Sequence, residues 1–161
     1  MQQAANNPNI LESAETVKIL SNVLKTNVSA CSSIGPFFTP QYGRLFLDMF
    51  GLYKAVSTII SDTVAQQGTV ATNTPRIRSL RAIKKDVLKL TETYIRKAEN
   101  TEEINTNLIP PLLDAILTDY SRNVPQARDA EVLNVMVTII SKLGVRFPTD
   151  FFQAQSSKMP F

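Results

Sequence analysis

Hydrophobic residues recur at three- and four-residue steps in five successive segments, the spacing that places side chains on one face of an α-helix. The first segment follows Ser13, a candidate N-cap, and stops at Gly35-Pro36. The second runs from Thr39-Pro40, where threonine would cap and proline would take the first helical position, to Gly68. The third opens in the same way at Thr74-Pro75. Since no segment alternates with period two over a useful length, the sequence predicts an all-α protein.

The fourth and fifth segments are less regular. The fourth opens at Asn100 or Thr101, and Pro110-Pro111 falls inside its apolar stripe. Because proline lacks an N–H and clashes with the preceding turn, we expect a kink there or a helix that begins at Pro110. Asp129 is the predicted N-cap of the fifth helix, which Gly144 closes. Five amphipathic helices with short connections fit either a bundle or an α-solenoid, and periodicity alone leaves both open.

Composition removes several classes of function. The 161 residues are 43% hydrophobic and 19% charged, which is ordinary for a globular chain. The absence of histidine excludes Ser-His-Asp and Cys-His nucleophile systems and histidine metal ligands. The single cysteine, Cys31, cannot form an internal disulfide or a cysteine zinc cluster. We therefore expect no catalytic residue, no cofactor and no metal.

Charge and hydropathy also limit the partners. A net charge of +3 is too slight to indicate nucleic acid. No apolar run approaches the ~20 residues that span a membrane, and the first residues do not form a secretory signal. We expect neither nucleic acid nor membrane as a direct partner.

The strongest charge run lies on the third predicted helix, between Arg76 and Lys89. Arg78, Arg81 and Lys85 share one face of that helix, together with Lys89. This strip is either a docking surface for an acidic partner or nucleic acid or, more commonly for such runs, a solvated helix face.

Carboxylates on the fourth predicted helix do not form a catalytic pair. Asp114 and Asp119 are five residues apart, about 140° around the helix, so they do not converge. Asp119 can instead reach Arg122 at i+3 in a local ion pair. The polar side that carries Asp114 and Arg122 either faces a partner or is simply exposed.

Four strings carry a resemblance to a known family: ETVKILSNVLKTNVSAC at 15–31, GRLFLDMFGLYKAVS at 43–57, RIRSLRAIKKDVLKL at 76–90 and IPPLLDAILTDYSRNVPQARDAEVL at 109–133. Together they resemble the chromosome region maintenance exportins, receptors of the karyopherin superfamily that carry leucine-rich export signals out of the nucleus. The resemblance is collinear over about residues 1–144.

This resemblance implies an α-solenoid of HEAT-type antiparallel helix pairs, about two and a half repeats long. Segments 13–31 and 75–98 would be outer helices, and segments 40–67 and 101–122 inner ones. The family binds cargo together with the GTP form of the GTPase Ran, meets nucleoporins, uses no cofactor, and shuttles between nucleus and cytoplasm.

The family's inner surface encloses the GTPase, which makes Asp114, Asp119 and Arg122 candidate partner-binding residues. The strip with Arg78, Arg81 and Lys85 would point outward and supplies the remaining candidates.

Two departures limit what the resemblance carries over. The family's cargo groove with its reactive cysteine, and its GTPase-binding N-terminal repeats, lie upstream of the matching part. Cys31 is therefore expected to be a small buried hydrophobic residue. Residues 145–161 align with nothing in the family, and we expect a divergent, poorly ordered tail.

A solenoid segment also leaves apolar surface open at both ends, so marginal stability and self-association are expected. The alternative function is that of a self-standing helical adaptor or scaffold.

Overall fold

The computed structural model describes residues 1–144, and the predicted tail at 145–161 lies outside the described residues. Within them every regular element is a helix, as predicted. Five long helices carry the fold: α2 Ala14–Ile34, α3 Thr39–Gln67, α4 Pro75–Lys97, α6 Ile109–Arg122 and α7 Glu131–Leu143. Shorter elements connect them: α1 Gln2–Asn6, α5 Thr101–Glu103, a π-helix at Ile104–Leu108, and 3₁₀ turns at Pro8–Glu12, Gly35–Phe38, Thr69–Asn73 and Pro125–Ala127.

Three predicted N-caps are confirmed. The side-chain oxygens of Ser13, Thr74 and Asn100 each accept a hydrogen bond from the backbone N–H three residues later. Each satisfies one of the donors that the first helical turn leaves free. Gly35 and Gly68 follow the helices as predicted, with φ of 56° and 80°, which non-glycine residues adopt at a cost.

Two predicted caps are wrong. The 3₁₀ turn at Gly35–Phe38 leads directly into α3, so Thr39 is already helical and its hydroxyl donates backwards to the carbonyl of Pro36. Asp129 does not cap α7 with its side chain, because Ala130 holds the N-cap position and the carboxylate is directed into the core.

The double proline produces a widened turn. Pro110 and Pro111 cannot donate to the carbonyls four residues earlier, and their rings crowd those carbonyls. The chain takes up one π-helical stretch at Ile104–Leu108 immediately before α6 begins at Ile109. The expected break is therefore a local change of helical pitch placed just ahead of the prolines.

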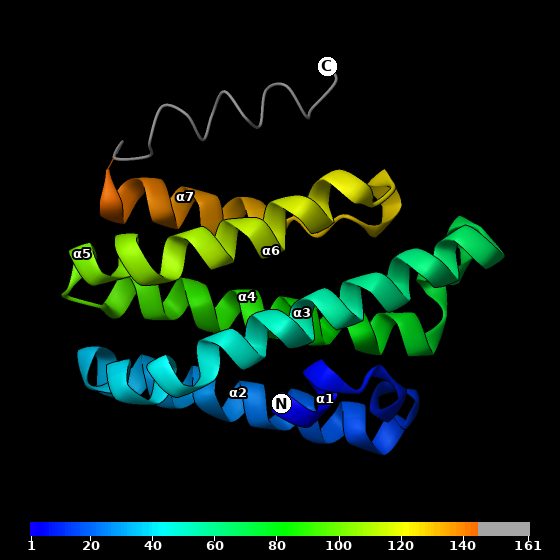
Figure 1. The fold of residues 1–161 in the computed structure, drawn as a ribbon, viewed down its shortest axis with the longest axis horizontal. Helices are drawn as coiled ribbons and strands as arrows, with labels where there is room; N and C mark the ends of the chain where they lie inside the picture. Colours follow the sequence, from blue (N-terminus) through cyan, green and yellow to red (C-terminus); the bar gives the residue numbers. More distant parts are fainter. Residues whose placement is uncertain (145–161) are drawn as a thin grey trace.

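The helices form two layers (Figure 1). One layer contains α2, α4 and α7 in that order, and the other contains α3 and α6, with the short α1 beside α3. Helix α4 is central, since it packs against α2, α3 and α7. The alternation of layers along the chain agrees with the outer and inner assignment that the resemblance implies, and the fold is an all-α helical repeat.

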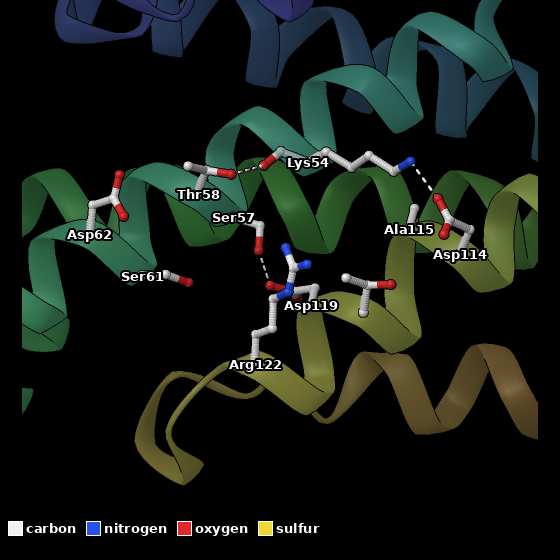
Figure 2. Close-up of a pocket in the computed structure, with 10 residues that line it drawn as sticks. Lys54, Ser57, Thr58, Ser61, Asp62, Asp114, Ala115, Asp119 and Arg122 are labelled. Carbon is white, nitrogen blue, oxygen red and sulfur yellow. Dashed lines mark hydrogen bonds and ion pairs between the residues drawn. The ribbon is translucent and has the colours of Figure 1, made fainter. Parts of the chain in front are cut away.

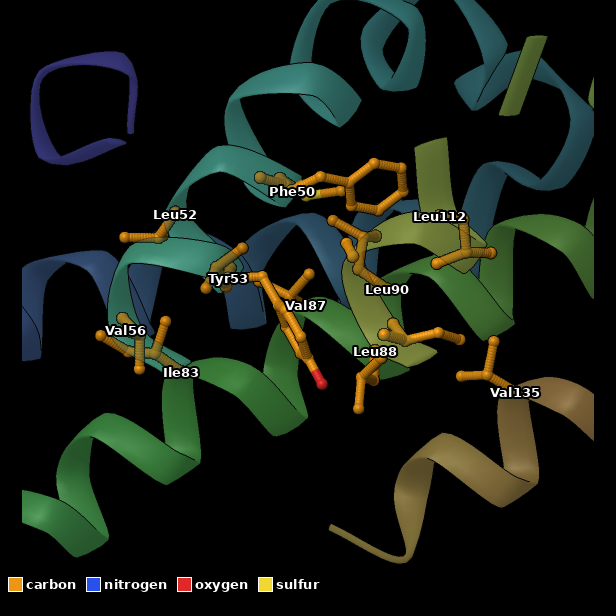
Figure 3. Packing of buried hydrophobic residues seen from close by; sticks show 14 of the residues in the cluster. Phe50, Leu52, Tyr53, Val56, Ile83, Val87, Leu88, Leu90, Leu112 and Val135 are labelled. Carbon is orange, nitrogen blue, oxygen red and sulfur yellow. The ribbon is translucent and has the colours of Figure 1, made fainter. Parts of the chain in front are cut away.

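The core lies between the layers (Figure 3). It consists of fully buried aliphatic and aromatic side chains from every long helix, among them Leu24, Leu52, Val56, Leu80, Ile83, Leu90, Leu112 and Val135. Cys31 is fully buried, as predicted, and burial raises the pKa of its thiol. Tyr42 stacks on Tyr94 with ring centroids 3.9 Å apart, which ties α3 to α4.

Candidate functional site

A polar cleft opens between the two helices of the second layer, α3 and α6 (Figure 2). Its volume is about 690 Å³. Hydroxyl and charged side chains line it: Lys54, Ser57, Thr58, Ser61 and Asp62 from α3, and Asp114, Thr118, Asp119 and Arg122 from α6. The two helices meet at the base of the cleft, where Ser57 and Ser61 of α3 donate to Asp119 and Asn123 at the end of α6, and exposed polar side chains of both helices line the opening.

An ion pair closes one end of the cleft. Lys54 Nζ lies 2.5 Å from a carboxylate oxygen of Asp114, and the side chains are 53% and 65% exposed. An exposed pair of this kind contributes at most about 1 kcal/mol to stability, so both groups can exchange partners readily. Figure 2 shows the pair on one side of the cleft and Asp62 on the other.

Asp119 forms the base of the cleft and is almost fully buried. Its carboxylate accepts hydrogen bonds from the hydroxyls of Tyr53 (2.9 Å) and Ser57. It also lies 2.6 Å from Nζ of Lys84, a side chain with no exposed surface. The side-chain amide of Asn123 donates a further hydrogen bond to the same carboxylate.

Lys84 joins this carboxylate to a second one. Its ammonium group lies 3.1 Å from Oδ2 of Asp129, which has no hydrogen bond of regular geometry within the described chain and is balanced by that charge. The other oxygen of Asp129 accepts from the guanidinium of Arg81 at 3.1 and 3.2 Å. Arg81, Lys84, Asp119 and Asp129 thus form a buried charge cluster with a net charge of zero, and two layers and two repeats meet at it.

The buried charge cluster changes the environment of the neighbouring Tyr53. Lys84 Nζ lies 5.0 Å from the centroid of the Tyr53 ring, a cation–π contact. Burial, and then the negative charge of Asp119, raise the pKa of the Tyr53 phenol well above its usual range. Tyr53 therefore stays a hydrogen-bond donor to Asp119 at any physiological pH.

Sequence reasoning missed Lys84 as a buried residue, although a signal was present. Ile77, Leu80, Lys84, Val87 and Thr91 follow one another at steps of three, four, three and four. This places Lys84 in the middle of the apolar stripe, where a lysine can be buried only if carboxylates meet it.

The predicted site residues on α6 differ in exposure and in their partners. Asp114 and Arg122 are exposed and both line the cleft. The predicted Asp119–Arg122 pair is wrong, because Asp119 is directed inward to Lys84. A local i, i+3 pair gains only tenths of a kcal/mol, so the buried lysine prevails.

The basic residues of α4 do not form one continuous outward strip. Arg81 donates to Asp129 and to the carbonyls of Gln126 and Arg128. Lys85 lies 3.5 Å from Glu131 at the start of α7. Only Arg78, of the three candidates, is exposed without an ion pair to another described residue.

The arrangement suits reversible polar binding. Among residues 1–144 no group of three His, Cys, Asp or Glu side chains could hold a metal ion. No helix of the described part is long and apolar enough to cross a membrane. The cleft presents hydroxyl groups and charges of both signs on two helices. The buried charge cluster beneath the cleft fixes the position of these helices.

Comparison with known proteins gives one consistent result. The family model described as "CRM1 C terminal" matches residues 41–153, so the match continues beyond residue 144, where the resemblance was expected to end. Exportin-1 of Schizosaccharomyces pombe is 57% identical over 142 residues, which is 88% of this chain and 13% of that protein. Protein EXPORTIN 1B of Arabidopsis thaliana is 40% identical over 89% of the chain, and Exportin-1 of Drosophila melanogaster 38% over 89%. The chain thus spans about an eighth of the length of these relatives (13% to 14%).

Proposed function

Because the chain belongs to the exportin family with the CRM1 C-terminal domain, we propose that it forms one wall of a nuclear export receptor and contacts a protein partner through the α3–α6 cleft. In this proposal the whole receptor binds leucine-rich export signals together with Ran-GTP and shuttles between nucleus and cytoplasm. The chain itself performs no catalysis.

The observation that carries the proposal is the contrast between the two layers. In the α2–α4–α7 layer, Arg81 and Lys85 are engaged in ion pairs with Asp129 and Glu131, and no polar cleft of comparable volume lies over this layer in the described residues. The α3–α6 layer presents Asp62, Asp114 and Arg122 in a cleft. Charges of both signs on a fixed surface give specificity and fast association with a complementary protein surface.

The backing of the cleft supports the same function. Asp119 on α6 accepts from Tyr53 and Ser57 on α3, and Ser61 donates to Asn123 at 2.9 Å. These contacts fix the separation of the two cleft helices. A partner that binds across both helices therefore meets a preorganised surface, which lowers the entropic cost of association.

A chimera tests the proposal in a complete receptor. Residues 1–144 would replace the aligned segment of fission yeast Exportin-1, and export of a nuclear reporter with a leucine-rich signal would be measured. We expect export to be retained. Loss of export by a correctly folded chimera would refute a receptor function for this segment.

Charge reversal in the cleft tests the contact surface. We expect Asp114→Lys and Arg122→Glu in the chimera to weaken binding of Ran-GTP, in the presence of an export-signal peptide, by about 5- to 30-fold, equivalent to 1–2 kcal/mol. Lys89→Glu, exposed on α4 and outside the cleft, is the matched control. Wild-type affinity in both cleft variants would show that the cleft is not the contact surface.

A further inference from the structure

The hydroxyl groups on the α3 side of the cleft have no hydrogen left to donate. Ser61 donates to Oδ1 of Asn123 at 2.9 Å, and Thr58 donates to the carbonyl of Lys54 at 3.0 Å. The amide of Asn123 is oriented by its own donation to Asp119, so Oδ1 can only accept. A hydroxyl has one hydrogen and two lone pairs, and both of these side chains can therefore only accept from a ligand.

Asp62 adds a full negative charge to this acceptor surface. It follows Ser61 on α3, lines the cleft, is exposed, and has no ion pair with another described residue. The α3 wall, by which we mean Thr58, Ser61 and Asp62, thus presents only oxygen acceptors. Such a wall suits a group with several N–H donors, and the guanidinium of arginine has five in a planar fork that fits a carboxylate.

Helix α6 carries the complementary charge at the same end of the cleft. The two helices run in the same direction, since their contacts advance along both together. Asp62 lies eight residues beyond Lys54, and Arg122 eight residues beyond Asp114, a rise of about 12 Å on each helix. Arg122 is exposed, points into the cleft (Figure 2), and has no ion pair within the described chain.

The two ends of the cleft therefore differ in charge balance. At one end Lys54 and Asp114 neutralise each other. At the other end Asp62 and Arg122 lie on opposite helices and await charges from outside the cleft. Both walls and the base are made by described helices, so the shape of the cleft is independent of the elements that flank this chain in a longer protein.

This charge pattern selects among possible occupants. An apolar segment would desolvate the acceptors and both charges without replacing their hydrogen bonds to water. A segment with only basic side chains would be repelled by Arg122, and one with only acidic side chains by Asp62. A segment that carries one charge of each sign meets both requirements.

We propose that the partner of this cleft inserts a basic side chain, preferentially arginine, against the α3 wall and an acidic side chain against Arg122. The inference rests on the proposed function, to which it adds the chemistry of the partner segment. It also fixes how the partner is oriented, because the basic side chain must face α3 and the acidic one α6.

A small cation tests the α3 wall in the 161-residue chain. Methylguanidinium and tetramethylammonium carry the same charge, but only methylguanidinium has N–H donors. In amide NMR titrations methylguanidinium should shift the signals of Thr58, Ser61 and Asp62 saturably, with a dissociation constant on the order of 10–100 mM, and tetramethylammonium should not. Asp62→Asn should weaken binding about fivefold, and Asp48→Asn, on the same helix outside the cleft, should leave it unchanged.

Two threonines provide a matched pair of variants for the same titration. Thr58 and Thr63 each donate to the carbonyl four residues earlier on α3, but only Thr58 lines the cleft. Thr58→Val removes one acceptor and should weaken methylguanidinium binding about threefold, whereas Thr63→Val should not change it. The proposal is overturned if methylguanidinium causes no saturable shift at the α3 wall, or if tetramethylammonium causes the same one.

Ran-GTP binding by the chimera separates this inference from the proposed function. Asp62→Asn should weaken binding by about 5- to 20-fold, alongside the loss expected for Arg122→Glu. Wild-type affinity in Asp62→Asn, with weakened binding in Arg122→Glu, would overturn the inference and leave the proposed function standing. Wild-type affinity in both variants, as when another segment of the receptor fills the cleft, would overturn the contact surface and the inference together. Circular dichroism, expected to match the wild type because both side chains are exposed, identifies any misfolded variant.

Discussion

Replacement of Lys84 by methionine is the most informative single change in the core. The side chains are similar in length, so the substitution removes a charge and leaves little cavity. In the wild type the two cations Arg81 and Lys84 balance the two anions Asp119 and Asp129. In Lys84→Met the same buried volume carries a net charge of minus one.

The size of the effect follows from what remains. Asp129 keeps Arg81, and Asp119 keeps the hydroxyls of Tyr53 and Ser57, so neither carboxylate is left without hydrogen bonds. The charge 2.6 Å from Asp119 is removed. Breaking a buried pair by removing one partner costs about 3–5 kcal/mol. For a chain of this size that corresponds to a fall in Tm of ~10 °C.

Urea unfolding of dilute protein at pH 7 and 10 °C, followed by circular dichroism at 222 nm, measures this loss of stability. Lys89→Met makes the same substitution at an exposed position of α4 and should change the free energy of unfolding by less than about 0.5 kcal/mol. The destabilisation in Lys84→Met should also be nearly independent of salt between 0.05 and 0.5 M, since buried charges are poorly screened.

A double variant makes the reasoning refutable even if Lys84→Met unfolds. Lys84→Met with Asp119→Asn restores a net charge of zero in the cluster and should recover at least half of the missing stability. If the double variant is no more stable than the single one, charge balance is not what Lys84 provides. A destabilisation in Lys84→Met equal to that in Lys89→Met would refute the argument directly.

Three further predictions concern other parts of the fold. Gly43→Ala should stabilise the protein by about 0.5–1 kcal/mol, because an added Cβ there meets nothing within 4 Å. Gly51→Ala should stabilise it less, because the added Cβ would lie only 3.0 Å from the Cβ of Ala5 in α1, and it should speed hydrogen exchange in α1. Burial raises the pKa of both Tyr42 and Tyr53 above their unfolded value near 10, so their contribution to stability is complete below pH 10 and falls as pH rises through it. Absorbance at 295 nm should show two tyrosines ionising only with unfolding, and ionisation of all four before unfolding would contradict this. Cys31 should react with a disulfide reagent at pH 8 no faster than the chain unfolds, and a rate near that of a free thiol would contradict its burial.

Much of the helical framework was predictable because its determinants are local. Ser13, Thr74 and Asn100 begin their helices by accepting from a backbone N–H three residues later, and Gly68 ends α3 through its own backbone freedom. Such signals need only a few neighbouring residues to be read.

The buried charge cluster was not predictable in this way. Asp129 has the residue type and position of an N-cap, an interaction that contributes about 1 kcal/mol. Its actual partners, Arg81 and Lys84, stand 45 to 48 residues earlier in the sequence. Together they offer two buried charge-assisted contacts, which outweigh one cap, but only after α4 and α7 have packed. The cleft was unpredictable for the same reason. Its base is Asp119, and the direction of that side chain depends on its long-range contact with Lys84.

The connection between α6 and α7 has a practical consequence for protein engineering. From its exposed residues it looks like a loop that would accept an epitope or a fluorescent protein. Arg81 holds it at three acceptors, and the Arg128 guanidinium donates to the carbonyl of Asn123 and lies 5.1 Å from the Tyr120 ring centroid. An insertion at 124–128 would therefore separate Asp129 from its cations, whereas one between Glu99 and Asn100, which are both exposed, would leave them in place. A reporter placed there would leave the contacts of Asp129 with Arg81 and Lys84 unchanged.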